Sequence, residues 1–504
     1  MRATRGVRCG LLALCAACGH VRNDTPGPNG SAGAWTDAPD GEPGTHWLAL
    51  LNDHVELVRF DENSPPTRVI VADSLQPGLV TAAFSDDGKQ LAYASPQAGT
   101  WELHVVSAPI GVASSRSWAI AESTPTLYWL GSNALLAWGR SDGPSRWVRT
   151  DQDAPLDLGF VSRPEGSADQ SALIAIANAD RRLLYLDGAA PPAWSEALPD
   201  DATARLAADG RALALFSRSA IPAQAFPLPT MRIQWSPPAS PTCTMFTPYT
   251  PCPTVPIYSV GSVMWQAADS PINAEVQGRS ETGADMTVVA IEPSDPTTIA
   301  VPSVYYPFLS RNWGVDSAGR TFIAANADDV SKPWWVELHA RGLESSRVTG
   351  FPGFAQYAAL SGDQQSLLVV GYLKSTNTST LYSAAYPPVE SSPPLPLFTS
   401  NEVIGALLPQ PGGPRFIVGT GALAFDDNCA DFASSDCDSL VYELSDGQSP
   451  PQPLPAGLED PQWTADGAGI IANLADGSVV YLDPSAPDQP KLLGRGGFVL
   501  PKHW

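Results

Sequence analysis

Residues 84–94 read Phe-Ser-Asp-Asp-Gly-Lys-Gln-Leu-Ala-Tyr-Ala. A tight polar turn separates two runs of strand-forming residues, and Asp-Gly between apolar positions is a strong signal for a β-hairpin. Residues 206–216 (Leu-Ala-Ala-Asp-Gly-Arg-Ala-Leu-Ala-Leu-Phe) and 463–473 (Trp-Thr-Ala-Asp-Gly-Ala-Gly-Ile-Ile-Ala-Asn) have the same pattern. The chain therefore contains several copies of one strand-turn-strand unit.

The unit recurs along most of the chain. With the last turn residue as reference, we place units at Gly88, Asn133, Gln170, Gly210, Asp269, Gly319, Gln364, Gly413 and Gly467. A large apolar residue follows every reference by three positions. Another usually precedes it by four, and the exceptions are Gly166 and Pro409. Units of about 40 to 50 residues with four short strands are typical of β-propeller blades.

We therefore expect an all-β chain, a propeller of four-stranded blades with about eight to ten units over residues 46–504. A β-sandwich, or a pair of them, also has many short strands but lacks a sustained sequence period. Segments 47–51, 55–61 and 69–73 look like three outer strands without an inner one. Residues 497–500, Gly-Phe-Val-Leu, could supply that strand and close the ring.

The repeat resembles a known family. Residues 84–93 give aromatic-Ser-x-Asp-Gly-Lys-x-Leu-Ala-Tyr, and residues 185–188 give Tyr-Leu-Asp-Gly. This pattern resembles the TolB-type propeller repeat over residues 46–500. The resemblance implies a propeller, and it does not fix a ligand or an activity.

Composition narrows the function classes. The 504 residues include 50 Pro and 42 Gly, which fits short strands joined by many loops. Asp and Glu total 52 against 29 Lys and Arg, for a net charge of −23. Such a charge repels phosphate backbones, so we expect no nucleic-acid partner.

The N-terminus has the features of an export signal. Arg2, Arg5 and Arg8 precede a short apolar run with small residues, and residues 19–45 are rich in Gly, Pro, Asn, Asp and Ser. Segment 14–18, Leu-Cys-Ala-Ala-Cys, resembles a bacterial lipoprotein signal, with ordinary cleavage as the alternative. We expect residues 1–17 to be removed and Cys18 to be lipidated. Residues 18–45 would then tether the propeller to the membrane over about 30 Å.

Four cysteines remain beyond the signal. Cys243 and Cys252 lie in a Pro-rich insertion at 236–256, and Cys429 and Cys437 lie in an acidic loop at 425–439. Two local disulfides suit an oxidising compartment, while four free thiols or a zinc site are the alternatives. The acidic loop could bind calcium through the carboxylates of Asp426, Asp427, Asp431, Asp436 and Asp438, or it is a solvated loop. We expect no other cofactor.

Catalytic motifs are weak. Residues 139–143 match Gly-x-Ser-x-Gly, but they fall between a second and a third strand, where a hairpin connection is the better interpretation. Histidines His46, His54, His104 and His339 are scattered. Trp334 and Trp335 lie in a third strand, whereas the inner-strand Trp129, Trp265 and Trp463 are predicted to pack between blades.

Three function hypotheses remain. We favour a non-enzymatic, monomeric propeller in the bacterial cell envelope, anchored only by its lipid and facing the periplasm or cell surface, which binds a protein, peptide or glycan. The second is a glycan-active hydrolase or lyase with acidic residues in the central channel. The third is a purely structural role. We expect the functional face to lie near the two insertions.

Overall fold

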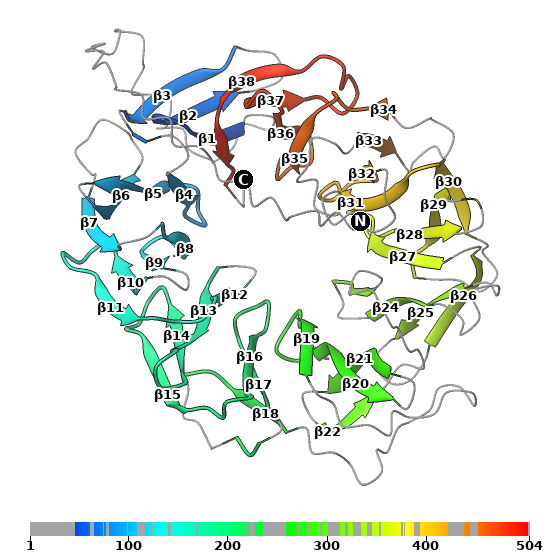
Figure 1. Cartoon of the computed structure of the whole chain (residues 1–504), viewed down its shortest axis with the longest axis horizontal. Coiled ribbons are helices and arrows are strands. Elements are labelled where there is room, and N and C mark those ends of the chain that lie inside the picture. Colours follow the sequence, from blue (N-terminus) through cyan, green and yellow to red (C-terminus); the bar gives the residue numbers. More distant parts are fainter. Residues whose placement is uncertain are drawn as a thin grey trace, which may run out of the picture.

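The computed structural model describes residues 46–501 apart from gaps in the loops, of which the longest are 108–115, 235–258, 301–312, 326–333, 422–437 and 444–451. In this part of the chain every regular element is a β-strand, and the strands form ten sheets. The sheets follow one another around a ring, each with its first strand nearest the axis (Figure 1). The expected all-β propeller is confirmed, with ten blades.

The first five blades, with strands given from the axis outward, are as follows. Blade 1 contains β39 (Gly497–Val499), β1 (His46–Leu51), β2 (Val55–Phe60) and β3 (Thr67–Ala72). Blade 2 contains β4 (Thr81–Phe84), β5 (Gln90–Gln97), β6 (Thr100–Ser107) and β7 (Arg116–Ala121). Blade 3 contains β8 (Thr126–Leu130), β9 (Ala134–Trp138), β10 (Ser145–Arg149) and β11 (Leu156–Gly159). Blade 4 contains β12 (Glu165–Gly166), β13 (Ala172–Ile176), β14 (Arg182–Asp187) and β15 (Ala193–Ala197). Blade 5 contains β16 (Thr203–Leu206), β17 (Leu213–Ser217) and β18 (Thr230–Gln234).

The other five blades complete the ring. Blade 6 contains β19 (Ser259–Met264), β20 (Ile272–Ser280), β21 (Gly283–Glu292) and β22 (Asp295–Ala300). Blade 7 contains β23 (Trp313–Val315), β24 (Thr321–Ala325), β25 (Trp334–His339) and β26 (Ser345–Phe351). Blade 8 contains β27 (Phe354–Leu360), β28 (Ser366–Leu373), β29 (Thr378–Ala385) and β30 (Leu395–Ser400). Blade 9 contains β31 (Val403–Pro409), β32 (Arg415–Gly421), β33 (Asp438–Glu443) and β34 (Gln452–Pro453). Blade 10 contains β35 (Leu458–Trp463), β36 (Ile470–Leu474), β37 (Ser478–Leu482) and β38 (Lys491–Arg495).

Blade 5 differs from the expected pattern. Its described residues form three strands, and β18 runs parallel to β17, with Leu213 opposite Thr230. All other neighbouring strands are antiparallel. The chain returns across this blade between residues 217 and 230 before adding its last strand, because a parallel neighbour needs a crossover connection.

The repeated turn is held by its own side chains. In blade 2 the Ser85 hydroxyl accepts a hydrogen bond from the Gln90 N–H at 2.9 Å and donates one to the Asp87 carboxylate at 2.7 Å. Gly88 adopts a φ of 65°, in the region that favours glycine. Blade 10 repeats the arrangement with Thr464 and Asp466. The Ser/Thr-x-Asp spacing therefore exists because these side chains satisfy the turn's backbone.

The residues four before and three after the reference position lie opposite each other in several hairpins. Phe84 lies opposite Leu91, Leu206 opposite Leu213, Leu360 opposite Leu367, Pro409 opposite Phe416, and Trp463 opposite Ile470. In blade 3 the shorter turn places Leu135, and not Leu136, opposite Trp129. In blade 7, Phe322 likewise lies opposite Gly314 and not Val315.

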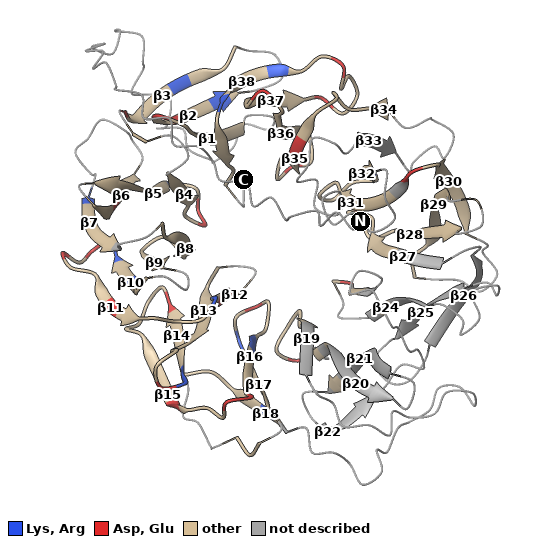
Figure 2. Ribbon diagram, viewed as in Figure 1, with Lys and Arg blue, Asp and Glu red and all other residues tan. Residues whose placement is uncertain are grey.

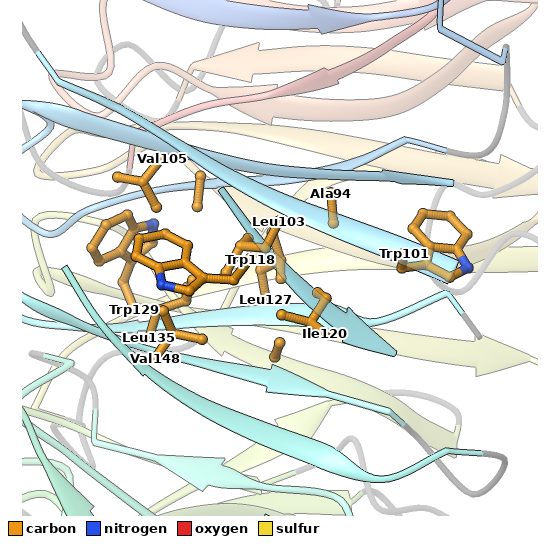
Figure 3. Packing of buried hydrophobic residues seen from close by; sticks show 12 residues of the cluster. Ala94, Trp101, Leu103, Val105, Trp118, Ile120, Leu127, Trp129, Leu135 and Val148 are labelled. Atoms are coloured by element: carbon orange, nitrogen blue, oxygen red, sulfur yellow. The ribbon is translucent and has the colours of Figure 1, made fainter. Parts of the chain in front are cut away.

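The cores lie between blades. Figure 3 shows one of them, where Trp101, Trp118 and Trp129 pack with aliphatic residues of blades 2 and 3. The predicted packing role of the inner-strand tryptophans is confirmed, since Trp129, Trp265 and Trp463 are all buried. Aromatic side chains of this size contribute a large share of the apolar area that each interface removes from water.

The ring closes as expected. β39 pairs with β1, so that Ala49 lies opposite Val499 and Leu51 opposite Gly497. Phe498 and Leu500 pack against the core between blades 1 and 10. Just beyond this strand pair, the Asn52 amide donates to the Arg495 carbonyl at 3.1 Å. This bond also links the first blade to the C-terminal segment. The last strand of the chain thus completes the first blade.

Candidate functional site

The two faces of the ring carry different connections. We call the face formed by the turns between first and second strands, such as 85–89, 167–171 and 464–468, the turn face. Because β39 runs antiparallel to β1, residue 46 and residue 501 both lie toward this face. The segments that hold the insertions, 235–258 and 422–437, begin and end at the opposite face, since each follows a strand that runs away from the turn face.

Hydrogen bonds link the turns of neighbouring blades on the turn face. The Gln90 amide donates to the Ser132 carbonyl at 2.8 Å, and the Gly131 N–H donates to the Gln170 carbonyl at 3.2 Å. On the far side of the ring the Gln410 amide donates to the Gly467 carbonyl at 2.7 Å. These bonds fix each turn against the next, so side chains at the ends of the first strands are held on a rigid rim.

A pocket opens beside this rim at blades 2 to 4. Its volume is about 220 Å³, and it reaches from the closing strand across three blades. Its lining is mostly apolar and consists of Ala83, Phe84, Leu127, Tyr128, Trp129, Gly166, Ser167, Gln170, Ala172, Leu173, Val499 and Leu500. A concave apolar site with a few polar groups is the usual form of a ligand-binding pocket.

Blade 4 creates the space. Gly166 lies opposite Leu173, the register position that Phe84 or Trp463 fills in other blades. A Cβ atom added at Gly166 would meet only the Ala172 carbonyl oxygen, at 3.7 Å, so the missing side chain leaves open space. Because β12 spans only Glu165–Gly166, the second strand of the blade also contributes to the wall. One exception to the repeat pattern therefore opens the pocket.

The first strands carry little charge. Within the described residues their charged side chains are Glu165, Arg205, Glu459 and Asp460. Figure 2 shows most of these strands in tan, with acidic residues on β35 and a basic one on β16. Strand β12, which holds Glu165, and strand β35, which holds Glu459 and Asp460, lie on different sides of the ring (Figure 1), so the described first strands do not bring two carboxylates together across the pocket.

Glu165 precedes the pocket residue Gly166 on β12, is not itself part of the pocket lining, and is partly buried. Its carboxylate is 3.3 Å from the Arg205 guanidinium and accepts a hydrogen bond from the Leu206 N–H at 2.9 Å. Burial raises the pKa of Glu165, while Arg205 and the Leu206 N–H oppose that rise. The pair joins the first strands of blades 4 and 5.

Two histidines lie away from the pocket. His104 stacks on Tyr93 in blade 2 with ring centroids 4.8 Å apart. Burial lowers the pKa of His104, and burial with the nearby Glu102 raises the pKa of Tyr93 to about 12. His46 is buried beside Phe60. Neither histidine is among the residues that line the pocket.

Several predicted site residues cannot be placed. Cys18, Cys243, Cys252, Cys429, Cys437, Asp426, Asp427, Asp431 and Asp436 lie outside the described residues. Asp438 begins β33. Arg140, Ser141 and Asp142 of the Gly-x-Ser-x-Gly match also lie outside the described residues. The match does fall between β9 and β10, the second and third strands of blade 3, as expected. In the part of the chain that is described, no three His, Cys, Asp or Glu side chains gather into a metal site. That part also contains no helix long and apolar enough to span a membrane.

Sequence reasoning noted Gly166 as an exception but did not recognise it as the floor of a pocket. The signal was available, because a glycine replaced a large residue at one fixed position of the repeat. What the sequence could not show is that Val499 and Leu500, more than 300 positions away, would complete the same pocket.

No family model matches this chain, and no curated protein matches it in sequence. Solved structures resemble it at low identity. A eukaryotic initiation factor has 10% identity, a TM-score of 0.46, and coverage of 91% of this chain and 98% of that one. Oligogalacturonate lyase in complex with manganese has 11% identity, a TM-score of 0.38, and coverage of 86% and 93%. The Dos1 propeller has 11% identity, a TM-score of 0.36, and coverage of 80% and 90%. These neighbours include an enzyme as well as a propeller module, and at such similarity they carry no argument about ligand or activity.

Proposed function

We propose that this protein is a non-enzymatic, monomeric propeller with TolB-type repeats that binds a protein, peptide or glycan through the pocket at Gly166. The observation that supports this proposal is the apolar pocket itself, held on a rigid rim at the turn face. Its volume of about 220 Å³ is below the roughly 300–1,000 Å³ of typical small-molecule sites. It therefore suits one side chain or one ring of a larger ligand.

Gly166→Trp tests this proposal. The full chain is applied to an array of random dodecapeptides and to an array of bacterial glycans. We expect wild-type binding on one array, loss of that binding in Gly166→Trp, and retention in the matched control Gly166→Ala. Absence of binding on both arrays, or binding that Gly166→Trp leaves intact, contradicts the proposal.

We further propose that the protein is exported and anchored in the bacterial cell envelope by lipid on Cys18. The supporting observations are the basic, apolar and small-residue segments of residues 1–18 and the polar tether that follows. A Cys18→Ala chain is expected to move from the membrane fraction to the soluble fraction. If Cys18→Ala stays with the membrane, residue 18 is not the anchor.

The two cysteine pairs are proposed to form local disulfides, Cys243 with Cys252 and Cys429 with Cys437. Mass spectrometry of unreduced peptides tests each pair. A calorimetric titration of the full chain with calcium tests the acidic loop at 425–439, and binding weaker than millimolar rules out a calcium site there.

One observation favours an enzyme as the second candidate. Glu165 directly precedes the pocket residue Gly166, and its raised pKa suits a general acid in glycoside cleavage. If this candidate is correct, the chain should shorten one of the glycans on the array, and Glu165→Gln should abolish the shortening while leaving glycan binding within about twofold. Unchanged glycans after incubation with the wild-type chain contradict it.

A further inference from the structure

The tryptophans of the first strands show how this fold holds an indole ring. The Trp129 indole N–H donates to the Ala83 carbonyl at 2.8 Å, and the Trp463 indole N–H donates to the Leu408 carbonyl at 2.9 Å. Both rings are buried between blades. In each case the ring reaches back from one blade to the first strand of the blade before it.

The acceptor occupies the same position in both cases. Ala83 directly precedes Phe84, and Leu408 directly precedes Pro409, which are the register positions of blades 2 and 9. Each acceptor residue is also paired with a residue of the second strand in its own blade. Its carbonyl oxygen accepts the indole N–H in addition. A carbonyl oxygen has two lone pairs, so the two bonds are compatible.

Blade 4 has the acceptor but not the indole. The blade before it is blade 3, whose register position is Trp129, so the corresponding acceptor is the carbonyl of Tyr128. Tyr128 lines the pocket, and Gly166 stands where the indole-bearing residue would be. On the side of blades 3 and 4 the apolar wall comes from Leu173 and Tyr128, which pack in the core between these two blades.

Building on the proposed function, we propose that the pocket binds a tryptophan side chain presented by a peptide or protein partner. The ring takes the place that Trp129 and Trp463 take in their own blades, and its N–H donates to the Tyr128 carbonyl. Ser167 and Gln170 line the pocket at the rim and contact the partner's backbone. An indole fits because the fold already buries two rings in this way.

The probe for this proposal is N-acetyl-5-fluorotryptophanamide, whose fluorine signal is distinct from the 15 tryptophans of the chain. Titration followed by fluorine NMR should show saturable binding. The analogue methylated on the indole nitrogen should bind about 3- to 10-fold more weakly, because it cannot donate to Tyr128. N-acetyl-leucinamide should bind more weakly than either.

Variants separate this proposal from the proposed function. Gly166→Trp should abolish binding of the probe, and Gly166→Ala should retain it. If the arrays yield a ligand that Gly166→Trp loses while the tryptophan probe does not bind, the pocket is a binding site and the tryptophan assignment is wrong. Equal affinity of the methylated analogue overturns the hydrogen bond to Tyr128.

The same chain carries a competing indole. Trp504 follows Leu500, a pocket residue, by four positions. Under our proposal, Trp504→Ala leaves the affinity for the probe within about twofold. A rise of tenfold or more in Trp504→Ala would instead identify the chain's own residue as the occupant and overturn the assignment to a partner.

Discussion

Blades 4 and 10 share the hydroxyl-held turn and the pairing of the residue before it, but they differ in the size of that residue. In blade 10, Trp463 fills the space toward blade 9 and donates to Leu408, whereas Gly166 leaves the equivalent space open in blade 4. The hydroxyl of Ser167 holds the blade 4 turn by accepting from the Ala172 N–H at 3.0 Å, as Thr464 does in blade 10. Each blade forms with this turn and this pairing whether the residue before the turn is large or small. A small residue there therefore leaves room for a ligand.

Blades 4 and 10 keep their neighbours only in a closed ring. Opening the ring should therefore lower the stability more than the substitutions described below. Deleting residues 495–504 removes β39, its pairing with β1 and the packing of Phe498 and Leu500. We expect the Tm to fall by roughly 10 °C or more in a thermal melt. Deleting only 502–504 is the control and should change the Tm little. An unchanged melt in the longer deletion would mean that the closing strand does not stabilise the ring.

The second prediction makes blade 10 resemble blade 4. Trp463→Ala should lower the free energy of unfolding by about 3–5 kcal/mol, because it leaves a cavity and removes the bond to Leu408. Added indole should restore part of this loss by binding in the new space. Urea unfolding with and without indole measures both effects. Trp463→Phe is the control and should lose only about 1 kcal/mol.

The third prediction makes blade 4 resemble blade 10. Gly166→Leu fills the pocket with an apolar side chain, and no positive φ at this position opposes the substitution. We expect the free energy of unfolding to stay the same or rise by about 1 kcal/mol, because Gly is a poor strand residue. Urea unfolding tests this expectation. A loss of 2 kcal/mol or more would show that the pocket cannot accept a side chain there.

The smallest effect concerns Glu165, next to Gly166. Its folded pKa is raised above the unfolded value, so its favourable contribution is present below pH 4.5 and is lost as the pH rises through the folded pKa. Glu165→Gln cannot ionise and should therefore gain stability relative to the wild-type chain between pH 4 and pH 7. The gain should be less than about 1 kcal/mol, because the side chain is about one-third exposed. A difference that stays constant with pH would contradict this assignment.

Much of the fold could be predicted from the repeat. The residues before and after each turn identified the hairpins, and the three unpartnered strands at the start pointed to a closing strand at 497–500. These features are local, or they follow from the need to pair every edge. The parallel pair in blade 5 could not be predicted, because strand direction there depends on a crossover between β17 and β18 that has no sequence period.

The site was harder to predict than the fold. The place of Trp129 and Trp463 in the first strands predicted buried rings, yet the hydrogen bonds that hold them join residues about 50 positions apart. The pocket needs blades 2, 3 and 4 together with the end of the chain. The sequence shows that Gly166 departs from the repeat pattern. Only the folded ring shows that this departure opens a pocket.

The closing strand also sets an order for folding. Ala49 and Val499 are 450 positions apart, so blade 1 stays incomplete until the end of the chain has been synthesised. Until then β1 presents an unpaired edge, which can pair with another chain. The pocket depends on the same event, because Val499 and Leu500 form part of its lining. Binding competence should therefore appear late, after the last strand has docked, so a ribosome-stalled or truncated chain would not bind the ligand.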